Sequence, residues 1–174
     1  MPIDRFQTLD LDTPTIDRLS NLHPDLAERL LRVYVHMFLE HGLTMRCTEG
    51  VRDFNRQASL YAQGRTTPGD IVTNAKPGES IHHYGLAADS CFKGNDPYMN
   101  KTKNGELYWR AFGNFCRIEE IEWGGDFQSI KDMPHAQKTY GFSVSEMKSM
   151  YQQDGFTTLW KAITARCKIV QHPS

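Results

Sequence analysis

Three residues whose side chains bind transition metals stand in two short stretches of the sequence: His82 and Asp89 in the first, and His135 in the second. A neutral imidazole and a carboxylate are both good zinc ligands, with bonds of ~2.0–2.2 Å. A catalytic zinc is typically held by three protein ligands and leaves its fourth position to water. If the fold brings these side chains together, they predict a hydrolytic zinc site.

The first stretch covers residues 80–89 and reads SIHHYGLAAD. Seven extended residues would span ~23 Å, so His82 and Asp89 can share one ion only if the chain bends between them. Gly85 supplies the conformational freedom for such a bend. Taken alone, the pair is more typical of a histidine in a turn and an aspartate at the end of a strand.

The second stretch, residues 123–135, begins with WGGDF and ends with DMPH. Pro134 favours extended geometry at Met133, which argues against a helix there. Asp132 and His135 are therefore expected on a shaped loop that leads into a strand. His135 would be the third ligand, and the Asp132 carboxylate would take a proton from the water on the metal and pass it to the leaving amine. By itself, this stretch is better interpreted as a surface turn with a partly exposed histidine.

Other hydrolytic and metal-binding patterns are missing from the sequence. The zincin motif H-E-x-x-H does not occur, nor do G-x-S-x-G or an active-site cysteine signature. The cysteines form no C-x-x-C pair, so no zinc ribbon is expected, and free thiols partly packed in the core are predicted. Asp126 follows two glycines and is expected to be a structural hydrogen-bond acceptor rather than a ligand.

Combined, the two stretches resemble the zinc DD-peptidase and L-alanyl-D-glutamate peptidase superfamily. The resemblance is carried by S-x-H-x-x-G-x-A-x-D at residues 80–89, W-G-G-D at 123–126 and D-x-P-H at 132–135. It runs from Gly42 to Gln137. Members include D-alanyl-D-alanine carboxypeptidases and dipeptidases and phage endolysins, and residues 64–69 (G-R-T-x-P-G) and 72–78 are similar to the endolysin branch. Phe127, where many relatives have tryptophan, is a mild departure.

The resemblance implies a role for each motif residue. It implies that Zn²⁺ is bound by His82, Asp89 and His135, and it selects His82 over His83 because the motif offsets fix the register. It also implies that Asp132, three residues before the last ligand, is the general base.

Two further residues are candidates for substrate binding. Arg52 matches an arginine that the family places near the substrate carbonyl or carboxylate, and its planar fork suits a carboxylate; the alternative is an ion pair with Glu49 or Asp53. Ser80 either hydrogen-bonds substrate or caps a turn. Gln57 and Tyr61 are expected to serve packing around Arg52 rather than catalysis.

The activity that the resemblance implies is peptidoglycan hydrolysis by a phage endolysin that cuts the L-alanyl-D-glutamate bond of the stem peptide. One alternative is a D-alanyl-D-alanine carboxypeptidase or dipeptidase with the same zinc centre. A non-catalytic zinc-binding module is the other, since Hedgehog signalling domains resemble this fold. The retained Asp132 argues against that module, because a structural site needs no proton shuttle.

The elements that must position these residues follow from hydrophobic periodicity. Helices are predicted over residues 24–40, 53–63, 106–118, 143–153 and 156–170, and strands over 43–48, 86–92, 121–123 and 135–137. Gly113 weakens the third helix. Helices and short strands alternate without a βαβ repeat, which predicts an α+β fold with a small antiparallel sheet flanked by helices. The resemblance implies its Hedgehog/DD-peptidase-like form.

Length and charge set the remaining expectations. The 174 residues, 39% hydrophobic and 24% charged, predict one globular catalytic domain over residues 1–174, with 141–174 as a C-terminal helical extension. The net charge of -1 gives no support for binding nucleic acid or an anionic membrane. No membrane span and no secretory signal are predicted. We expect a monomer made in the host cytoplasm that reaches the periplasmic wall after the membrane is permeabilised.

Overall fold

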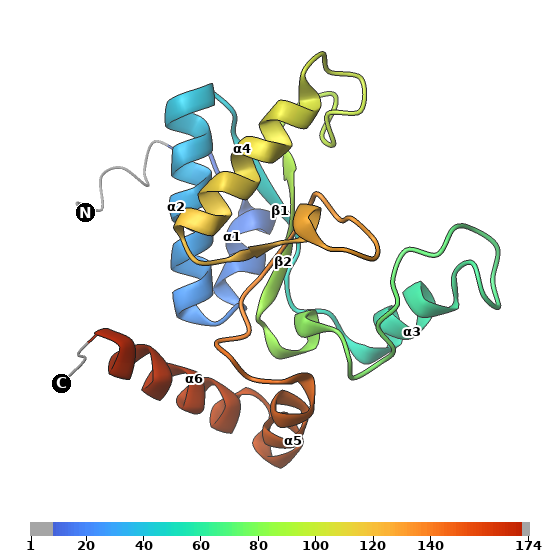
Figure 1. The fold of residues 1–174 in the computed structure, drawn as a ribbon, viewed down its shortest axis with the longest axis vertical. Helices are drawn as coiled ribbons and strands as arrows, with labels where there is room; N and C mark the ends of the chain where they lie inside the picture. Colours follow the sequence, from blue (N-terminus) through green and yellow to red (C-terminus); the bar gives the residue numbers. More distant parts are fainter. Residues whose placement is uncertain (1–8, 172–174) are drawn as a thin grey trace. The chain divides into compact units, whose positions relative to one another are not determined.

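The computed structural model describes residues 9–171, whose chain forms two compact units (Figure 1). The first unit comprises the chain up to Gly50 together with Ala87–Lys138. The second comprises Val51–Leu86 and the chain from Thr139 onward. The expectation of one catalytic domain with a helical extension stays a prediction.

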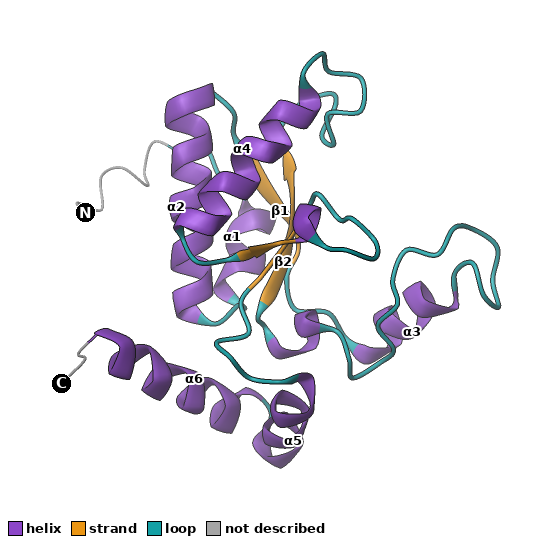
Figure 2. Ribbon diagram, in the orientation of Figure 1, coloured by secondary structure: helices purple, strands orange, loops and turns teal. Residues whose placement is uncertain are grey.

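The first unit is an antiparallel sheet with helices packed on it. Its strands lie in the order β1-β2-β4-β3, and every neighbouring pair is antiparallel. Figures 1 and 2 show α1, α2 and α4 on the same side of the strands. This confirms the predicted α+β class with a small antiparallel sheet. The elements are α1 (Thr13–Ser20), α2 (Pro24–His41), β1 (Met45–Glu49), β2 (Ala87–Phe92), α4 (Gly105–Ile118), β3 (Glu122–Trp123), the 3₁₀ helix η3 (Gly124–Asp126) and β4 (His135–Gln137).

The ends of the helices in this unit follow local rules. Helix α2 has proline in its first turn and ends at Gly42, whose φ of 66° lies in the left-handed region, as its sequence predicts. Helix α1 was not predicted. The Asp12 side chain caps it by accepting a hydrogen bond from the Thr15 amide at 2.9 Å. It is a short helix, and only two of its eight residues, Thr15 and Leu19, are buried.

The two faces of the sheet have different roles. Ala88, Phe92 and Ala136 belong to the hydrophobic core of this unit. Because side chains alternate along a strand, Asp89 on β2 and His135 on β4 project from the opposite face. The pattern that buries the core therefore also places both predicted ligands on one surface.

Trp123 explains why glycine stands inside α4. A Cβ added at Gly113 would overlap the Trp123 ring, and one added at Gly125 would overlap the same ring. The Trp123 indole donates a hydrogen bond to the Met133 carbonyl at 2.8 Å. Gly113 therefore costs helix propensity but lets the indole pack closely, and the indole holds the loop that leads to β4.

The second unit is helical and builds its own core. The Asp53 side chain caps α3 by accepting a hydrogen bond from the Arg56 amide at 2.8 Å. A capping box formed by Ser143 and Glu146 begins α5. The elements are α3 (Phe54–Ala62), the 3₁₀ helix η2 (Ile81–Tyr84), α5 (Val144–Asp154) and α6 (Phe156–Gln171).

The two C-terminal helices pack around η2. The core of the second unit joins Tyr84 and Leu86 to Met147 of α5 and Leu159 of α6. The Trp160 indole also donates to the Tyr84 carbonyl at 3.0 Å. Helices α5 and α6 thus hold the short turn that contains His82.

The cysteines are free thiols, as expected, and three of them, Cys47, Cys91 and Cys116, are buried. Burial raises the pKa of the Cys47 thiol to about 12, so this group stays protonated at neutral pH. In the part of the chain that the structure describes, no helix combines the length and apolar character that crossing a bilayer requires.

Candidate metal centre

Asp89 and His135 form a cross-strand pair. The register of β2 and β4 places these two residues directly opposite each other. Side chains in such a pair have Cβ atoms about 4.5–5.5 Å apart, close enough to interact. The His135 Nδ1 lies 3.0 Å from Asp89 Oδ1, and His135 is 8% exposed. Strand register alone therefore brings together two of the predicted ligands, 46 positions apart in the chain.

The charge around His135 stabilises its protonated form. Burial lowers the pKa of His135, but the hydrogen bond and negative charge of Asp89 oppose it, and the Asp132 charge adds to their effect. The net result is a raised pKa. The site is thus electrostatically suited to a cation, whether a proton on the ring or a metal ion beside it.

His82 lies in η2, at the tight turn that precedes β2. Gly85 ends this turn with a φ of 68°, in the left-handed region that favours glycine. The His82 carbonyl accepts hydrogen bonds from the Arg52 amide at 3.2 Å and the Gly85 amide at 3.3 Å. The bend predicted at Gly85 is therefore present, and His82 is held by its own backbone at 2% exposure.

The three predicted ligands form a group that could hold a metal ion. His82, Asp89 and His135 each offer one ligand atom, and these atoms all lie within 4.8 Å of one another. Bonds of ~2.0–2.2 Å around one tetrahedral ion would place ligand atoms roughly 3.4 Å apart, which is within this limit. Two imidazoles and a carboxylate are also a donor set that suits zinc.

His83 has a packing role, which agrees with the choice of His82. Its ring stacks on Phe54 with centroids 4.1 Å apart and planes 3° from parallel. Its Nδ1 lies 2.7 Å from the Arg52 carbonyl oxygen, and burial lowers the pKa of the ring. A buried imidazole that is neutral and donates to a carbonyl helps to fix the turn that His82 occupies.

Asp132 is held by its backbone beside the last ligand. Its amide donates to the Gly124 carbonyl at 3.0 Å, and its own carbonyl accepts from the His135 amide at 3.1 Å. A Cβ added at Gly124 would overlap the Asp132 carbonyl oxygen. Glycine at position 124 therefore permits the close approach that shapes this loop. The loop leads into β4, as expected from Pro134.

Arg52 and Ser80 lie in the second unit, near the turn that carries His82. The Arg52 guanidinium donates to Gln57 Oε1 at 2.9 Å, and the buried Gln57 donates to the Ala75 carbonyl at 2.7 Å. This confirms the supporting role expected for Gln57. Ser80 precedes η2 but makes no side-chain capping bond. Substrate binding by Arg52 and Ser80 stays a prediction.

Asp126 and Phe127 behave as the sequence suggests. Asp126 accepts hydrogen bonds from the Arg117 guanidinium through both carboxylate oxygens, at 2.7–3.0 Å, so it is a structural acceptor. The Phe127 ring lies against His135, with centroids 5.6 Å apart at 52°. An aromatic ring in this position limits the motion of the His135 imidazole, and here that ring is Phe127.

Two supporting residues were missed from the sequence: Gln137 and Glu122. His135 Nε2 lies 2.9 Å from Gln137 Oε1, and Gln137 Nε2 donates to Glu122 Oε2 at 2.9 Å. Because the Gln137 amide NH₂ donates to Glu122, its amide oxygen faces His135 and accepts a hydrogen bond from the Nε2–H group. In the neutral ring, Nδ1 is then unprotonated and faces the metal group. Strand alternation, which puts residue i+2 on the same face, was the signal that would have found Gln137.

Replacing Gln137 with leucine is expected to lower zinc affinity or activity by about 10–100-fold, since partners that orient a metal-binding histidine have effects of this size. The Kd for zinc, measured by competition with a chromophoric chelator, checks this. Gln128→Leu is a matched control because Gln128 is exposed and contacts only the Asp126 carbonyl among the bonds described. Equal zinc affinity and activity in Gln137→Leu and the control would contradict the assigned role.

Tyr98 is a further neighbour that the sequence did not single out. Burial raises the pKa of its phenol, and the negative charges of Asp89 and Asp132 raise it further. The phenol therefore lies in the electrostatic field of two site carboxylates. Its position in a polar loop outside every motif gave no signal for this.

In comparison with known proteins, the segment of the chain that carries these residues is similar to peptidases. A family model described as D-alanyl-D-alanine carboxypeptidase matches residues 73–138, which include His82, Asp89, Asp132 and His135. The peptidoglycan L-alanyl-D-glutamate endopeptidase CwlK of Bacillus subtilis (strain 168) is 40% identical over 100 residues, which is 54% of this chain and 60% of CwlK. The chain thus spans less than two thirds of that relative. The crystal structure of the Serratia marcescens L-Ala D-Glu endopeptidase ChiX has a TM-score of 0.49 at 21% identity, over 77% of this chain and 93% of ChiX.

Proposed function

We propose that this chain is a zinc-dependent endopeptidase of the bacterial cell wall that hydrolyses the L-alanyl-D-glutamate bond of the stem peptide. The observation that carries the proposal is the group of His82, Asp89 and His135, with Asp132 held three residues before the last of them. The match to the carboxypeptidase family model over this segment supports the reaction class. The 40% identity to CwlK supports the choice of bond.

The residues would divide the reaction among them. The two imidazoles and the Asp89 carboxylate would hold a zinc ion, which would lower the pKa of a bound water and polarise the scissile carbonyl. Asp132 would act as the general base and acid, taking a proton from the attacking water and passing one to the amine nitrogen of the leaving D-glutamyl residue. Arg52 binds a substrate carbonyl or carboxylate through its planar fork, and Ser80 donates a hydrogen bond to the peptide.

A second candidate is a D-alanyl-D-alanine carboxypeptidase with the same residues in the same roles. The description of the matching family model favours it. The two activities differ in which end of the stem peptide enters the site, and the chemistry of Asp132 is common to both. A zinc-binding module without catalysis is the third candidate, and the position of Asp132 disfavours it.

Mass spectrometry of digested muropeptides separates these candidates. The purified protein, loaded with zinc, is incubated with sacculi, and its metal content is measured in the same sample. New peptides with N-terminal D-glutamate are expected, together with about one zinc per chain. Release of free D-alanine instead would replace the proposal with the second candidate. Bound zinc with no cleavage at all would favour the third.

We also propose that the protein acts as a phage endolysin, made inside the host and reaching the wall after the membrane is permeabilised. The G-R-T-x-P-G segment at residues 64–69 and its continuation at 72–78 support this origin. Expression inside bacteria is expected to lyse the cells only when the membrane is permeabilised separately. Lysis without permeabilisation would contradict the proposed route.

A further inference from the structure

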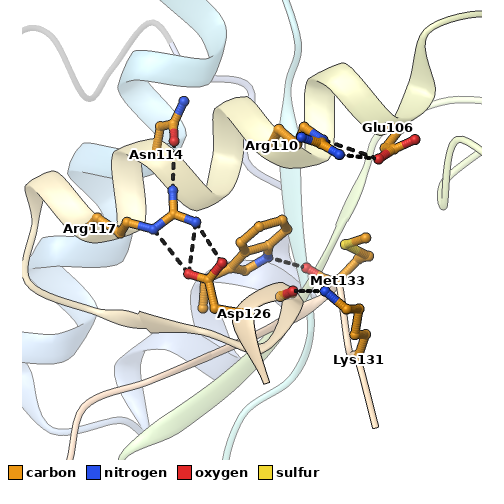
Figure 3. Close-up of a pocket in the computed structure, with 9 residues that line it drawn as sticks. Glu106, Arg110, Asn114, Arg117, Asp126, Lys131 and Met133 are labelled. Atoms are coloured by element: carbon orange, nitrogen blue, oxygen red, sulfur yellow. Dashed lines mark hydrogen bonds and ion pairs between the residues drawn. The ribbon is translucent and has the colours of Figure 1, made fainter. Parts of the chain in front are cut away.

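A pocket of about 490 Å³ opens in the first unit beside the loop that carries Asp132 (Figure 3). This volume lies within the range of about 300–1,000 Å³ typical of small-molecule sites. Helix α4 forms one wall and the segment from η3 to Met133 forms the other. The polar side chains that line it are Glu106, Arg110, Asn114, Arg117, Asp126 and Lys131.

Most of the charged side chains that line this pocket form ion pairs with one another. The Arg110 guanidinium pairs with Glu106 at 2.7 Å, and Arg117 pairs with Asp126 at 2.7 Å (Figure 3). An anionic ligand would have to displace Asp126, which accepts from two nitrogens of Arg117. The pocket therefore offers closely spaced donors and acceptors at a small net charge, which suits an uncharged ligand rich in hydroxyl and amide groups better than a phosphate or carboxylate.

The pocket borders the loop that carries the proposed general base. Lys131 and Met133 line it and are the two chain neighbours of Asp132. The Lys131 ammonium donates to the Gly125 carbonyl at 3.3 Å, and the Trp123 indole donates to the Met133 carbonyl at 2.8 Å. A ligand in the pocket would therefore contact the loop that carries Asp132 at the residues on either side of it.

A second hollow continues the first. It has a volume of about 440 Å³ and shares Arg117, Trp123 and Asp126 with the first pocket. It also includes Phe127, whose ring lies against His135. Two adjacent hollows on either side of one ion pair suit a ligand made of two linked rings better than a single compact one.

We propose that these two hollows bind the amino-sugar strand of peptidoglycan, through its hydroxyl and N-acetyl groups; the inference rests on the proposed function. In peptidoglycan the L-alanine amine is joined to the lactyl group of the sugar. Only the lactyl group and one amino acid, the latter ~3.3–3.6 Å long when extended, therefore separate that sugar ring from the L-alanyl-D-glutamate bond. An enzyme that cuts this bond must accommodate the sugar near its general base, and the first hollow borders the loop that carries Asp132.

The test compares two substrates that differ only in the sugar: the N-acetylated stem tetrapeptide, and the same peptide joined to the disaccharide. The wild-type protein is expected to show at least a tenfold higher kcat/KM for the sugar-linked peptide. Asn114→Phe fills the pocket from an exposed position of α4 and is expected to abolish that preference, with the free peptide cleaved within about twofold of wild type. Arg110→Ala should reduce the preference through lost hydrogen bonds.

Leu107→Phe is the matched control, because Leu107 is on the same helix, is 61% exposed and does not line the pocket. It should retain the full preference, and melting temperatures of all variants should agree. Equal kcat/KM for the two substrates in the wild type, or an equal loss on both in Asn114→Phe, would overturn the inference. A third result would also overturn it: Asn114→Phe loses activity only on cell walls that carry anionic polymers and regains it when those polymers are stripped. That result would assign the pocket to an anionic polymer.

A binding measurement separates failure of this inference from failure of the proposed function. The disaccharide without peptide is titrated into the wild-type protein and followed by the NMR signal of the Trp123 indole, which needs no cleavage. Saturable binding that Asn114→Phe weakens at least tenfold supports the sugar site even if no substrate is cut. Absence of binding by the wild type overturns the sugar site, even if the stem peptide is cleaved.

Discussion

Replacing His135 with alanine is expected to reduce zinc binding to background and to lower hydrolysis of the stem peptide by at least about 10³-fold. A catalytic zinc contributes several kcal/mol of transition-state stabilisation, and each 1.36 kcal/mol corresponds to tenfold in rate. His135 also organises the group, because it faces Asp89 through Nδ1 and Gln137 through Nε2. Metal content by mass spectrometry and kcat/KM on the sugar-free tetrapeptide measure the two effects.

The control for this substitution is His36→Ala. His36 lies on α2, with its ring stacked on Phe115 at 5.0 Å and hydrogen-bonded to Glu40. It is a histidine of the same unit that belongs to no metal group among the described residues. We expect it to retain one zinc and wild-type activity. Wild-type zinc affinity in His135→Ala would remove this histidine from the site, and activity that survives complete chelation would remove the metal from the reaction.

Local patterns predicted most of the elements because local physics decides them. The helix at residues 24–41 has a clear apolar period, a proline at its start and a left-handed glycine after its end, so its bounds could be predicted closely. The strands near Asp89 and His135 were recognised as short extended segments. Helix α1 was missed because it is short and buries little, and its stability comes from the Asp12 cap and from packing on β1.

The candidate ligands could be named from motif spacing, but their supports could not. Gln137 orients His135 only because β3 and β4 pair in a register that sets Glu122 opposite Gln137. The sequence alone does not determine a pairing between segments this short. Gly113 was interpreted as a weakness of its helix, whereas close packing of the Trp123 ring requires it. The pocket along α4 depends on the same packing of Trp123 against α4, and no sequence pattern indicates it.

Replacing Asp132 with asparagine or alanine is expected to lower kcat by about 10²–10⁴-fold, with zinc content and fold retained. This range is what loss of a general acid–base group typically costs. Asparagine keeps the shape of the side chain but has no basic carboxylate, so it accepts no proton from the water. The measurements are kcat on the stem peptide, zinc content and melting temperature. Asp17→Asn, at an exposed position on α1, is the matched control and should leave all three unchanged.

The backbone at position 132 makes this experiment informative. The bonds that shape the loop, from the Asp132 amide to Gly124 and from the His135 amide to the Asp132 carbonyl, involve main-chain atoms and survive either substitution. A loss of kcat with zinc in place therefore reports the carboxylate itself. If zinc is lost together with activity, Asp132 contributes to holding the metal rather than to moving the proton. Full activity in both variants would remove Asp132 from the mechanism. The aspartate of the D-x-P-H motif would then be interpreted as a residue without a catalytic role.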